Sequence, residues 1–437
     1  MSITQIKTST ARPSAVPMLI SSTPVLRETE HFYLDLGQAS AEILAFLNDN
    51  KEHWRPNVIN FSRQYVSDGL RGRPITRDLA WGIPIPLDGY ESKRIYVWFE
   101  AVIGYFSASI EWAKNQGQPE AWKTWWYEPA AKTYYFIGKD NIPFHAVIWP
   151  GELIATGRRM YEDDPTKRLN LPYDVPSNEY LNMEGKKLST SRNWAIWVPD
   201  LLERFDPDPL RFYLAFIAPE SRDTDFTFED FVRRNNDELV ATWGNLVNRT
   251  LGFAYKRYEG QVPSPGPEGL DELDQAIIAE VEAGFESVGE LLTGVKLKAA
   301  LDEALRLARS ANVYIDRKAP WKAFKEDPVG AGTSIYVTLR VIDNLKLLLA
   351  PFLPHTCQQL HEYLGYDGQL FGRQFTQAFS ETERQHVALC YDGSPAEGRW
   401  SPSQLPPGQP LREPQPLFKK LEPEVAEEEL ARLLGAF

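Results

Sequence analysis

Cysteine is scarce in this chain of 437 residues, which contains only Cys357 and Cys390. Two cysteines are too few for a disulfide framework or a four-cysteine zinc site, so we expect a reducing, cytoplasmic location and no metal site in the chain. No apolar run approaches the roughly 20 residues that a membrane-spanning helix needs, which excludes a membrane protein. The apolar patch at residues 16–20 is too short for the core of a secretory signal.

Positive charge is also in deficit, because the formal net charge is −13. This charge argues against general nucleic-acid binding but leaves room for a selective RNA partner, since local patches decide binding. The 13 tryptophans are numerous. We expect most of them in cores or interfaces and some to stack on a base or close a pocket.

The stretch that points most directly to chemistry is residues 185–192, Gly-Lys-Lys-Leu-Ser-Thr-Ser-Arg. A flexible glycine, two adjacent lysines and three hydroxyl side chains are typical of a loop that holds an anion. Lysine brings a point charge to phosphate oxygens, and hydroxyls and backbone N–H groups supply neutral donors. On these residues alone, a solvated basic turn is an equally good interpretation.

The first part of the chain predicts an α/β fold. After a lead over residues 1–22 that we expect to be unstructured, residues 39–48 have helical spacing. Residues 95–99 and 134–138 are short apolar runs that predict buried strands, and residues 101–114 between them predict a helix. Strand, helix and strand in succession favour crossover units in a parallel sheet.

Polar residues follow both predicted strands, where open α/β sheets bind their ligands. Glu100 follows the first strand, and the run Gly138-Lys139-Asp140-Asn141 begins at the end of the second. A glycine there lets a ligand approach the backbone closely. The alternative is a tight turn with Lys139 in solvent.

From Phe231 onward the pattern becomes helical. Apolar residues share one helical face over residues 273–292 and again over 297–315, and a third helix is predicted over 335–349. These segments predict an all-α bundle. Residues 393–415, rich in Pro, Ser and Gly, predict a linker, and residues 416–437 predict a final charged helix.

The loop and its flanks, residues 180–184 and 193–197, resemble the KMSKS region of the methionyl members of the class I aminoacyl-tRNA synthetases. Residues 96–105 and 136–145 resemble further segments of the same family, so the resemblance extends from about residue 23 to the end. The sequence departs from the family where Thr190 replaces the usual second lysine, which would leave the phosphate contact to Lys186 or Lys187. Val102, where the family often has proline, is a milder departure.

The resemblance implies roles for particular residues. It implies a methionine pocket walled by Trp98, Tyr105, His145 and Trp149, although a lone histidine in an apolar stretch is usually a core residue. It implies ATP binding by Gly138, Lys139, Asp140, Lys187 and Thr190, with Lys186, Lys187, Ser189, Thr190 and Ser191 as the catalytic loop. It implies anticodon reading by Asn245, Arg249, Pro320 and Trp321, the alternative being a solvated helix face and a core tryptophan. Flanking cations would supply the local positive field: Arg233, Arg234, Lys256, Arg257, Arg317, Lys318 and Lys322.

The implied architecture is the second half of a Rossmann-like parallel sheet over residues 23–155, and a linking region with the KMSKS-like loop over 156–230. An anticodon-binding helical bundle follows over 231–392, then a linker and helix over 393–437. None of the six histidines has the spacing of the family's HIGH motif, and the cysteine-rich zinc knob is absent. We therefore expect a C-terminal portion lacking the HIGH-motif half: a truncated chain, or one half of a split enzyme with a separately encoded N-terminal half.

The implied function is methionine–tRNA ligation, with ATP and Mg²⁺ as cofactors and methionine and tRNA-Met as partners. Two alternatives remain open: a catalytically inert remnant that still binds tRNA, and an unrelated nucleotidyl-transferring enzyme that uses only the phosphate loop.

Overall fold

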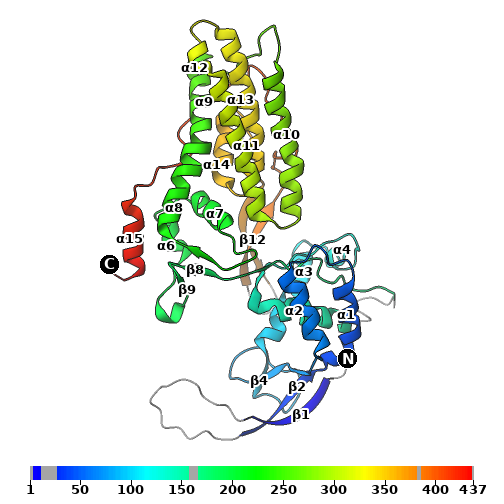
Figure 1. Ribbon diagram of the computed structural model, residues 1–437. Helices are drawn as coiled ribbons and strands as arrows, with labels where there is room; N and C mark the ends of the chain where they lie inside the picture. Colours follow the sequence, from blue (N-terminus) through cyan, green and yellow to red (C-terminus); the bar gives the residue numbers. More distant parts are fainter. Residues whose placement is uncertain (1–2, 11–26, 157–165, 381–384, 436–437) are drawn as a thin grey trace. The chain divides into compact units, whose positions relative to one another are not determined.

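The computed structural model describes residues 3–10, 27–156, 166–380 and 385–435, which fall into two compact units, residues 1–178 and residues 179–437 (Figure 1). Each unit has hydrophobic clusters of its own. The predicted helical bundle belongs to the second unit.

The first unit is a set of helices with short strands between them. Its helices are α1 (Ser40–Asn48), α2 (Pro56–Ser67), α3 (Val97–Asn115), α4 (Lys123–Trp126) and α5 (Trp149–Thr156), with 3-10 turns at Leu36–Ala39 and Lys139–Asn141 and a π-helical segment at Phe144–Ile148. Its strands are β1 (Ile3–Thr10), β2 (Arg27–Leu34), β3 (Arg73–Pro74), β4 (Thr76–Asp78), β5 (Lys93–Ile95), β6 (Ile137–Gly138) and β7 (Ser177–Asn178).

The strand predicted over residues 95–99 is wrong for most of its length. Strand β5 ends at Ile95, and α3 begins at Val97 after the extended residue Tyr96. A short apolar run does not separate a buried strand from the start of a buried helix, because periodicity needs a longer window. Of the second predicted strand, only Ile137 and Gly138 are in a strand, with Tyr134 in an isolated parallel bridge to Asp174.

The two predicted strands do not share a parallel sheet among the described residues. Strand β5 pairs antiparallel with β4, whereas β6 pairs parallel with β7. The lead also differs from the expectation, since residues 3–10 pair antiparallel with β2 as strand β1. Residues 11–22 of that lead lie outside the described residues.

The described residues of the first unit form three hydrophobic clusters, the smallest of them around Leu34, Leu36 and Ile148. Helices α1 and α2 enclose another through Ile43, Leu47 and Val58. The third is aromatic: Phe106 of α3 packs edge-on against Trp122 and Trp126, at ring-centre distances of 5.1 and 4.9 Å. This aromatic cluster includes Trp149, one of the predicted pocket residues.

The second unit contains the bundle and a small sheet. Its helices are α6 (Val198–Leu202), α7 (Pro207–Phe216), α8 (Phe228–Arg234), α9 (Asn245–Arg257), α10 (Glu272–Thr293), α11 (Leu297–Lys318), α12 (Pro320–Ala323), α13 (Pro328–Leu349), α14 (Pro354–Tyr363) and α15 (Glu424–Leu433), with a π-helical segment at Asn235–Gly244 and a 3-10 turn at Thr190–Arg192. Its strands are β8 (Leu181–Met183), β9 (Lys186–Lys187), β10 (Thr224–Phe226), β11 (Arg373–Ser380) and β12 (Gln385–Asp392).

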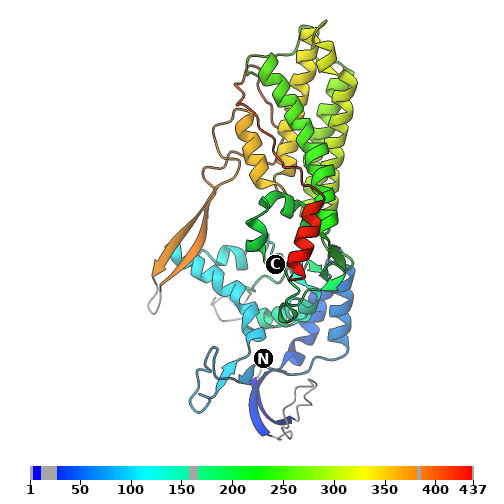
Figure 2. The same ribbon diagram turned by 90° about the vertical axis from the view of Figure 1, so that its left-hand side faces the viewer.

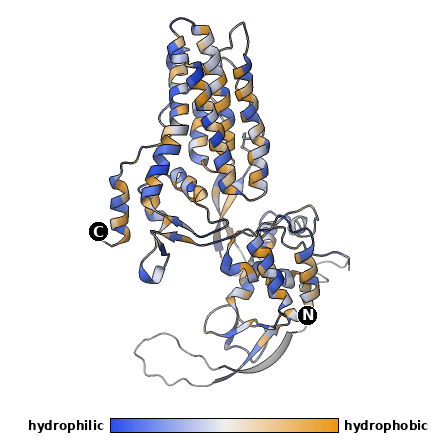
Figure 3. Ribbon diagram, viewed as in Figure 1, coloured by the Kyte–Doolittle hydropathy of each residue, from blue (hydrophilic) through white to orange (hydrophobic). Residues whose placement is uncertain are grey.

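The predicted helices form the bundle. Helices α9, α10, α11 and α13 are striped with hydrophobic and hydrophilic residues along their length (Figure 3). Their apolar faces make one core, and α10 and α11 begin and end within a few residues of the predicted bounds. Helices α10, α11 and α13 pack closely at Gly284 of α10, where an added Cβ would lie 2.5 Å from Leu307 and 2.8 Å from Leu348. Only glycine lets these three helices approach so closely.

The sequence did not predict the hairpin of β11 and β12 within the helical region. The strands pair antiparallel from Arg373 and Asp392 to Ser380 and Gln385, and the hairpin projects from the bundle (Figure 2). On β12, Val387, Leu389 and Tyr391 are exposed. The alternation of exposed and half-buried residues along β12 is the two-residue period of a strand.

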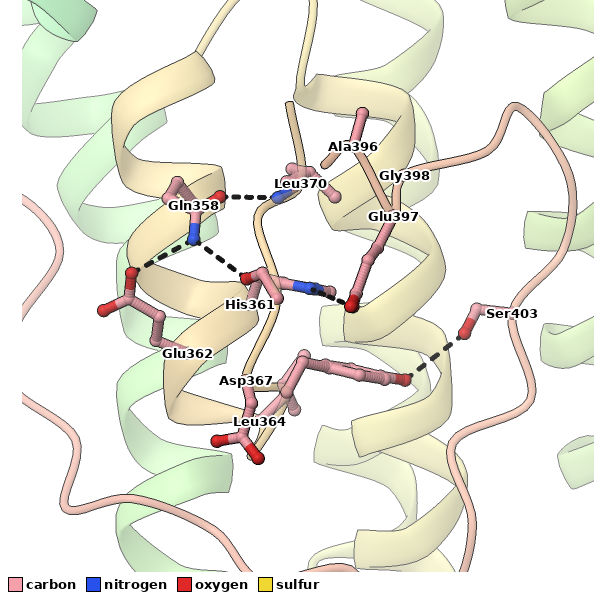
Figure 4. Close-up of polar contacts among 12 residues, drawn as sticks. Gln358, His361, Glu362, Leu364, Asp367, Leu370, Ala396, Glu397, Gly398 and Ser403 are labelled. Carbon is pink, nitrogen blue, oxygen red and sulfur yellow. Dashed lines mark hydrogen bonds and ion pairs between the residues drawn. The ribbon is translucent and has the colours of Figure 1, made fainter. Parts of the chain in front are cut away.

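The segment after α14 is fastened to the bundle by side chains of that helix (Figure 4). The Gln358 amide oxygen accepts the backbone N–H of Leu370 at 2.7 Å, and its amide nitrogen donates to Glu362 at 3.0 Å. One turn later, His361 Nε2 lies 3.8 Å from the Glu397 carboxylate. Helix α14 thereby holds the entry to the hairpin, and the Glu397 N–H fastens the chain that follows by donating to the Gln369 carbonyl at 2.8 Å.

The small sheet has the order β10-β8-β9, with β8 and β10 parallel. Its core joins Met183, Phe226 and Phe231 with Leu433 of α15. Helix α15 lies beside α8 in both views (Figures 1 and 2). The C-terminal helix therefore completes the hydrophobic core that supports the hairpin β8–β9.

Candidate functional site

Three of the four predicted pocket residues, Tyr105, His145 and Trp149, contact Tyr135 in the first unit, and the fourth, Trp98, packs against Phe144. Trp98 and Tyr105 are seven residues apart on α3 and so share a face, and His145 and Trp149 are four apart across the π-helical segment and α5. The Tyr105 hydroxyl lies 2.8 Å from His145 Nε2. The structure thus brings Tyr105 and His145 into direct contact from two separate elements.

The hydrogen bonds of His145 define its tautomer. Its Nδ1 lies 3.0 Å from the Asn141 carbonyl oxygen, which only accepts, so Nδ1 carries the proton. Nε2 is then the acceptor, and the Tyr105 hydroxyl donates to it. Burial lowers the pKa of His145, which keeps the ring neutral near pH 7.

The predicted pocket side chains differ in how far they are exposed to solvent. Trp149 is buried, and its indole N–H donates to the Tyr135 hydroxyl at 3.0 Å. Trp98 and Tyr105 are 45% and 43% exposed, and the Trp98 ring lies 5.4 Å from that of Phe144. An apolar, polarizable group could pack against the two buried and two accessible rings.

The glycine run lies at the end of β6, close in sequence to the pocket residues. Gly138 pairs with Asn178 of β7 in extended conformation, and a Cβ added to it would meet no atom within 4 Å. Lys139 and Asp140 follow in the 3-10 turn Lys139–Asn141. Among the described residues, the backbone of Gly138 is thus uncovered on the side where a Cβ would stand.

The phosphate-loop sequence begins in the second unit as the turn of hairpin β8–β9. Glu184 and Gly185 both have positive φ, 49° and 73°, the backbone that a two-residue hairpin turn requires. The Asp225 carboxylate fixes this turn by accepting the N–H of Gly185 at 2.8 and 3.0 Å. Glu184 accepts the N–H of Phe228, the first residue of α8, at 2.9 Å.

The two lysines of the loop rest on aromatic rings. The Lys186 ammonium lies 4.2 Å from the Trp194 ring centre, and the Lys187 ammonium lies 4.8 Å from that of Tyr180. At exposed sites such contacts contribute only about 0.5–1 kcal/mol. Both lysines are exposed, so a phosphate group would readily draw them away.

The hydroxyl residues follow β9 directly. Ser189 pairs with Trp194 in an antiparallel bridge, and its hydroxyl lies 3.2 Å from that of Ser191. Thr190 opens the 3-10 turn Thr190–Arg192 and is exposed. The predicted donors therefore lie on one short turn next to the lysines.

Two of the predicted anticodon residues are in contact at the end of the bundle that carries α12. The Arg249 guanidinium on α9 lies 4.1 Å from the Trp321 ring centre, and it is 3.8 Å from the Asp316 carboxylate. Asn245 begins α9 one turn before Arg249 and is exposed. Pro320 is buried and begins α12 after Ala319, whose φ of 42° turns the chain sharply.

The predicted positive field is weaker than the sequence suggests. Arg233 and Arg234 form ion pairs with Asp230 on the same helix. The Lys318 ammonium lies 2.6 Å from Asp271 and 2.7 Å from Asp274. These three cations are neutralised within the fold, which leaves the field to the rest of the set: Lys256, Arg257, Arg317 and Lys322.

Sequence reasoning missed residues that hold the site residues in place. Tyr135 accepts the Trp149 N–H, Asp225 anchors the loop turn, and Trp194 and Tyr180 contact the lysines. Tyr180 and Trp194 flank the loop in the sequence and were available as a signal. Asp225 lies about 40 residues away, and only strand pairing between β8 and β10 brings it near.

Two further features are absent from the part of the chain that the structure describes. Among the described residues, no three His, Cys, Asp or Glu side chains are arranged to hold a metal ion. Over the same part of the chain, no helix is both long and apolar enough to cross a membrane.

Family models match both parts of the chain. The model for class I tRNA synthetases (M) matches residues 8–251, and the model for the anticodon-binding domain of methionyl tRNA ligase matches residues 262–390. Methionine--tRNA ligase of Thermomicrobium roseum is 55% identical over 95% of this chain and 70% of its own. The enzyme of the same name from Chloroflexus aggregans is 53% identical over 94% and 69%.

A solved structure has the same fold. Mycobacterium tuberculosis methionyl-tRNA synthetase, bound by methionyl-adenylate, superposes with a TM-score of 0.74 over 96% of this chain and 77% of its own, at 22% identity. The likeness supports a class I catalytic domain followed by a helical anticodon-binding domain.

The class I match represents the catalytic domain in this chain. This match gives no support to three of the expectations from the sequence. They are that the HIGH-motif half is lacking, that the enzyme is split with a separate N-terminal half, and that the chain is an inert remnant. The alignment with the Thermomicrobium roseum enzyme covers 95% of the chain, and the two family models match residues 8–251 and 262–390. The chain belongs to the methionyl-tRNA synthetase family of class I aminoacyl-tRNA ligases.

Proposed function

We propose that this chain activates methionine with ATP and transfers it to tRNA-Met in the cytoplasm. The observation that carries the proposal is the hydrogen bond between Tyr105 and His145, next to the ring of Tyr135. In the first step a methionine carboxylate oxygen attacks the α-phosphorus of ATP and pyrophosphate leaves. In the second, a terminal tRNA hydroxyl attacks the methionyl carbonyl and AMP leaves.

The methionine side chain would lie against Trp98, Tyr105, His145 and Trp149. A thioether is apolar and packs favourably at ring edges, where sulfur–aromatic contacts contribute about 0.3–1.5 kcal/mol. A neutral His145 suits an uncharged side chain, because an imidazolium would favour a carboxylate instead. This arrangement supports selection of methionine over charged amino acids.

ATP would bind against Gly138, Lys139 and Asp140, and the loop would hold its phosphates. Because Thr190 offers a hydroxyl and no charge, we assign the positive charge on the departing pyrophosphate to Lys187, assisted by Lys186. Ser189, Thr190 and Ser191 would add neutral donors. Such groups act mainly by positioning and by stabilising charge in the transition state.

Mg²⁺ would enter with the triphosphate, neutralising charge between phosphate oxygens. The ion usually keeps several waters and takes few protein ligands. The chain's own residues would orient the phosphates around it.

The bundle would read the anticodon. Asn245 and Arg249 suit base edges, and Trp321, presented by Pro320, offers a plane for stacking. We assign the anticodon domain to residues 231–392 and the linker and helix to 393–437. We further assign residues 23–155 to the catalytic domain and residues 156–230 to the linking region.

Methionine-dependent ATP–pyrophosphate exchange tests the proposal. The wild-type chain should exchange pyrophosphate with methionine and with no other standard amino acid. Lys187→Ala should lower kcat by about 100-fold, the cost of one lost transition-state donor, and Lys186→Ala should lower it less. The control is Lys420→Ala, an exposed lysine near the C-terminal helix. Equal exchange by the Lys187 and Lys420 variants would refute the loop assignment.

A further inference from the structure

Tyr135 contacts three of the four predicted pocket residues: Trp149, Tyr105 and His145, whose ring centre lies 5.9 Å from its own. Its hydroxyl accepts the Trp149 indole N–H at 3.0 Å, and both side chains are buried. Its ring lies 5.0 Å from that of Tyr105 at an interplanar angle of 71°, an edge-to-face pair. Tyr105 lies on α3 and Trp149 on α5, so Tyr135 connects two elements that the pocket needs in register.

The position of Tyr135 is itself fixed by the backbone. Its N–H donates to the Asp174 carbonyl at 3.0 Å, and the preceding residue, Tyr134, forms a parallel bridge with Asp174. Successive side chains of extended backbone point to opposite sides. Tyr134 accordingly packs against Tyr173, with ring centres 5.2 Å apart, while Tyr135 faces the pocket residues.

The Trp149 indole needs this acceptor. A buried indole N–H finds a partner in most proteins, since leaving it unpaired is costly. No other acceptor for Trp149 Nε1 is found among the described residues. Without the Tyr135 hydroxyl, the indole would be free to rotate toward a new partner and would change the shape of the pocket wall.

We propose that Tyr135 is a positioning residue for methionine: it orients Trp149 through its hydroxyl and Tyr105 through its ring, and so sets the affinity of the pocket. Tyr135 itself need not touch the amino acid. The inference rests on the proposed methionine pocket and adds a residue that no motif of the sequence indicates.

The experiment compares adjacent tyrosines. Tyr135→Phe removes one oxygen atom and keeps the ring, and Tyr134→Phe is the matched control. In pyrophosphate exchange, Tyr135→Phe should raise the KM for methionine about 10-fold, the effect of one buried hydrogen bond, with the KM for ATP and kcat nearly unchanged. Tyr134→Phe should leave all three values at wild type. An unchanged methionine KM in Tyr135→Phe would overturn the inference.

A double-mutant cycle separates positioning from general loosening. If Tyr135 acts through the indole N–H, then in a Trp149→Phe background the further change Tyr135→Phe should have little effect. If the two substitutions raised the methionine KM additively, Tyr135 would not act through the Trp149 indole N–H. If Trp149→Phe alone leaves the methionine KM unchanged, the proposed pocket fails as well. Thermal unfolding of each variant shows whether it is folded, and should Trp149→Phe not fold, the tyrosine pair decides the question.

Discussion

The guanidinium of Arg204 donates to both carboxylate oxygens of Glu429, at 2.6 and 2.8 Å, across 225 residues of sequence. Glu429 is buried, whereas Arg204 is partly exposed. This pair joins the segment after α6 to α15, whose Leu433 belongs to the core beneath the β8–β9 hairpin. The C-terminal helix is therefore held by charge as well as by apolar contact.

Glu429→Ala should detach α15. Removing one partner leaves the Arg204 charge without its acceptor, and losing a buried pair in this way costs about 3–5 kcal/mol, less here because Arg204 reaches solvent. Amide hydrogen exchange should rise across residues 424–433. The control, Glu428→Ala, changes an exposed neighbour and should keep wild-type protection. Equal exchange in the two variants would contradict a role for the ion pair.

Trp321→Ala should weaken tRNA use and leave amino-acid activation intact. Loss of one stacked base costs about 1–3 kcal/mol, so kcat/KM for tRNA in aminoacylation should fall by roughly 5- to 150-fold. Methionine-dependent pyrophosphate exchange, measured without tRNA, is the internal control and should not change. A fall in both activities would show damage to the fold, and a fall in neither would remove Trp321 from the anticodon site.

Gly284→Ala should destabilise the bundle, although alanine is the better helix former. The added methyl would lie 2.5 Å from Leu307 and 2.8 Å from Leu348, and overpacking of this kind costs about 1–3 kcal/mol. Gly252 of α9 is the matched control, since its Cβ would meet no atom within 4 Å, and Gly252→Ala should stabilise by about 1 kcal/mol. Urea unfolding measures the change in the free energy of unfolding for both variants. If both changes had the same sign, close helix packing at Gly284 would be contradicted.

His361 should make stability fall in mild acid. Burial and the Lys346 ammonium, 3.0 Å from its Nδ1, lower the pKa of His361 from 6.5 to about 4 (Figure 4 shows its surroundings). The unfolded chain takes up a proton near pH 6.5 that the folded chain refuses. The contribution of His361 to the free energy of unfolding is therefore complete above pH 6.5. It is lost, at about 1.4 kcal/mol per pH unit, as the pH falls toward 4. In urea unfolding between pH 4.5 and 7, His361→Gln should show a shallower slope than His355→Gln.

Glu152 should make the chain less stable as the pH rises, which is the opposite of the effect of His361. Burial raises the pKa of this carboxyl to about 9, and neither oxygen has a hydrogen-bond partner among the described residues. The folded chain thus keeps a proton that the unfolded chain releases near pH 4.5. Stability is lost as the pH rises from 4.5 through 9, by about 1.4 kcal/mol per unit at most. Glu152→Gln should be more stable than wild type at pH 8, and the exposed control Glu52→Gln should not.

The sequence by itself determined the features that depend on near neighbours. Long amphipathic helices such as α10 and α11 follow from period alone, because a 22-residue stripe fits no other structure. The local composition of residues 185–192 marked an exposed cationic turn, which the hairpin β8–β9 and its following turn contain.

Only the tertiary structure decided the features that join distant residues. The run at residues 95–99 becomes a helix start because β5 finds its partner in β4 and ends at Ile95, which no local pattern states. Arg249 meets Trp321 because α9 and α12 end together in the bundle, and Lys318 is withdrawn from the positive field by Asp271 and Asp274. Each of these contacts depends on which surfaces are buried together, and burial is a property of the whole fold.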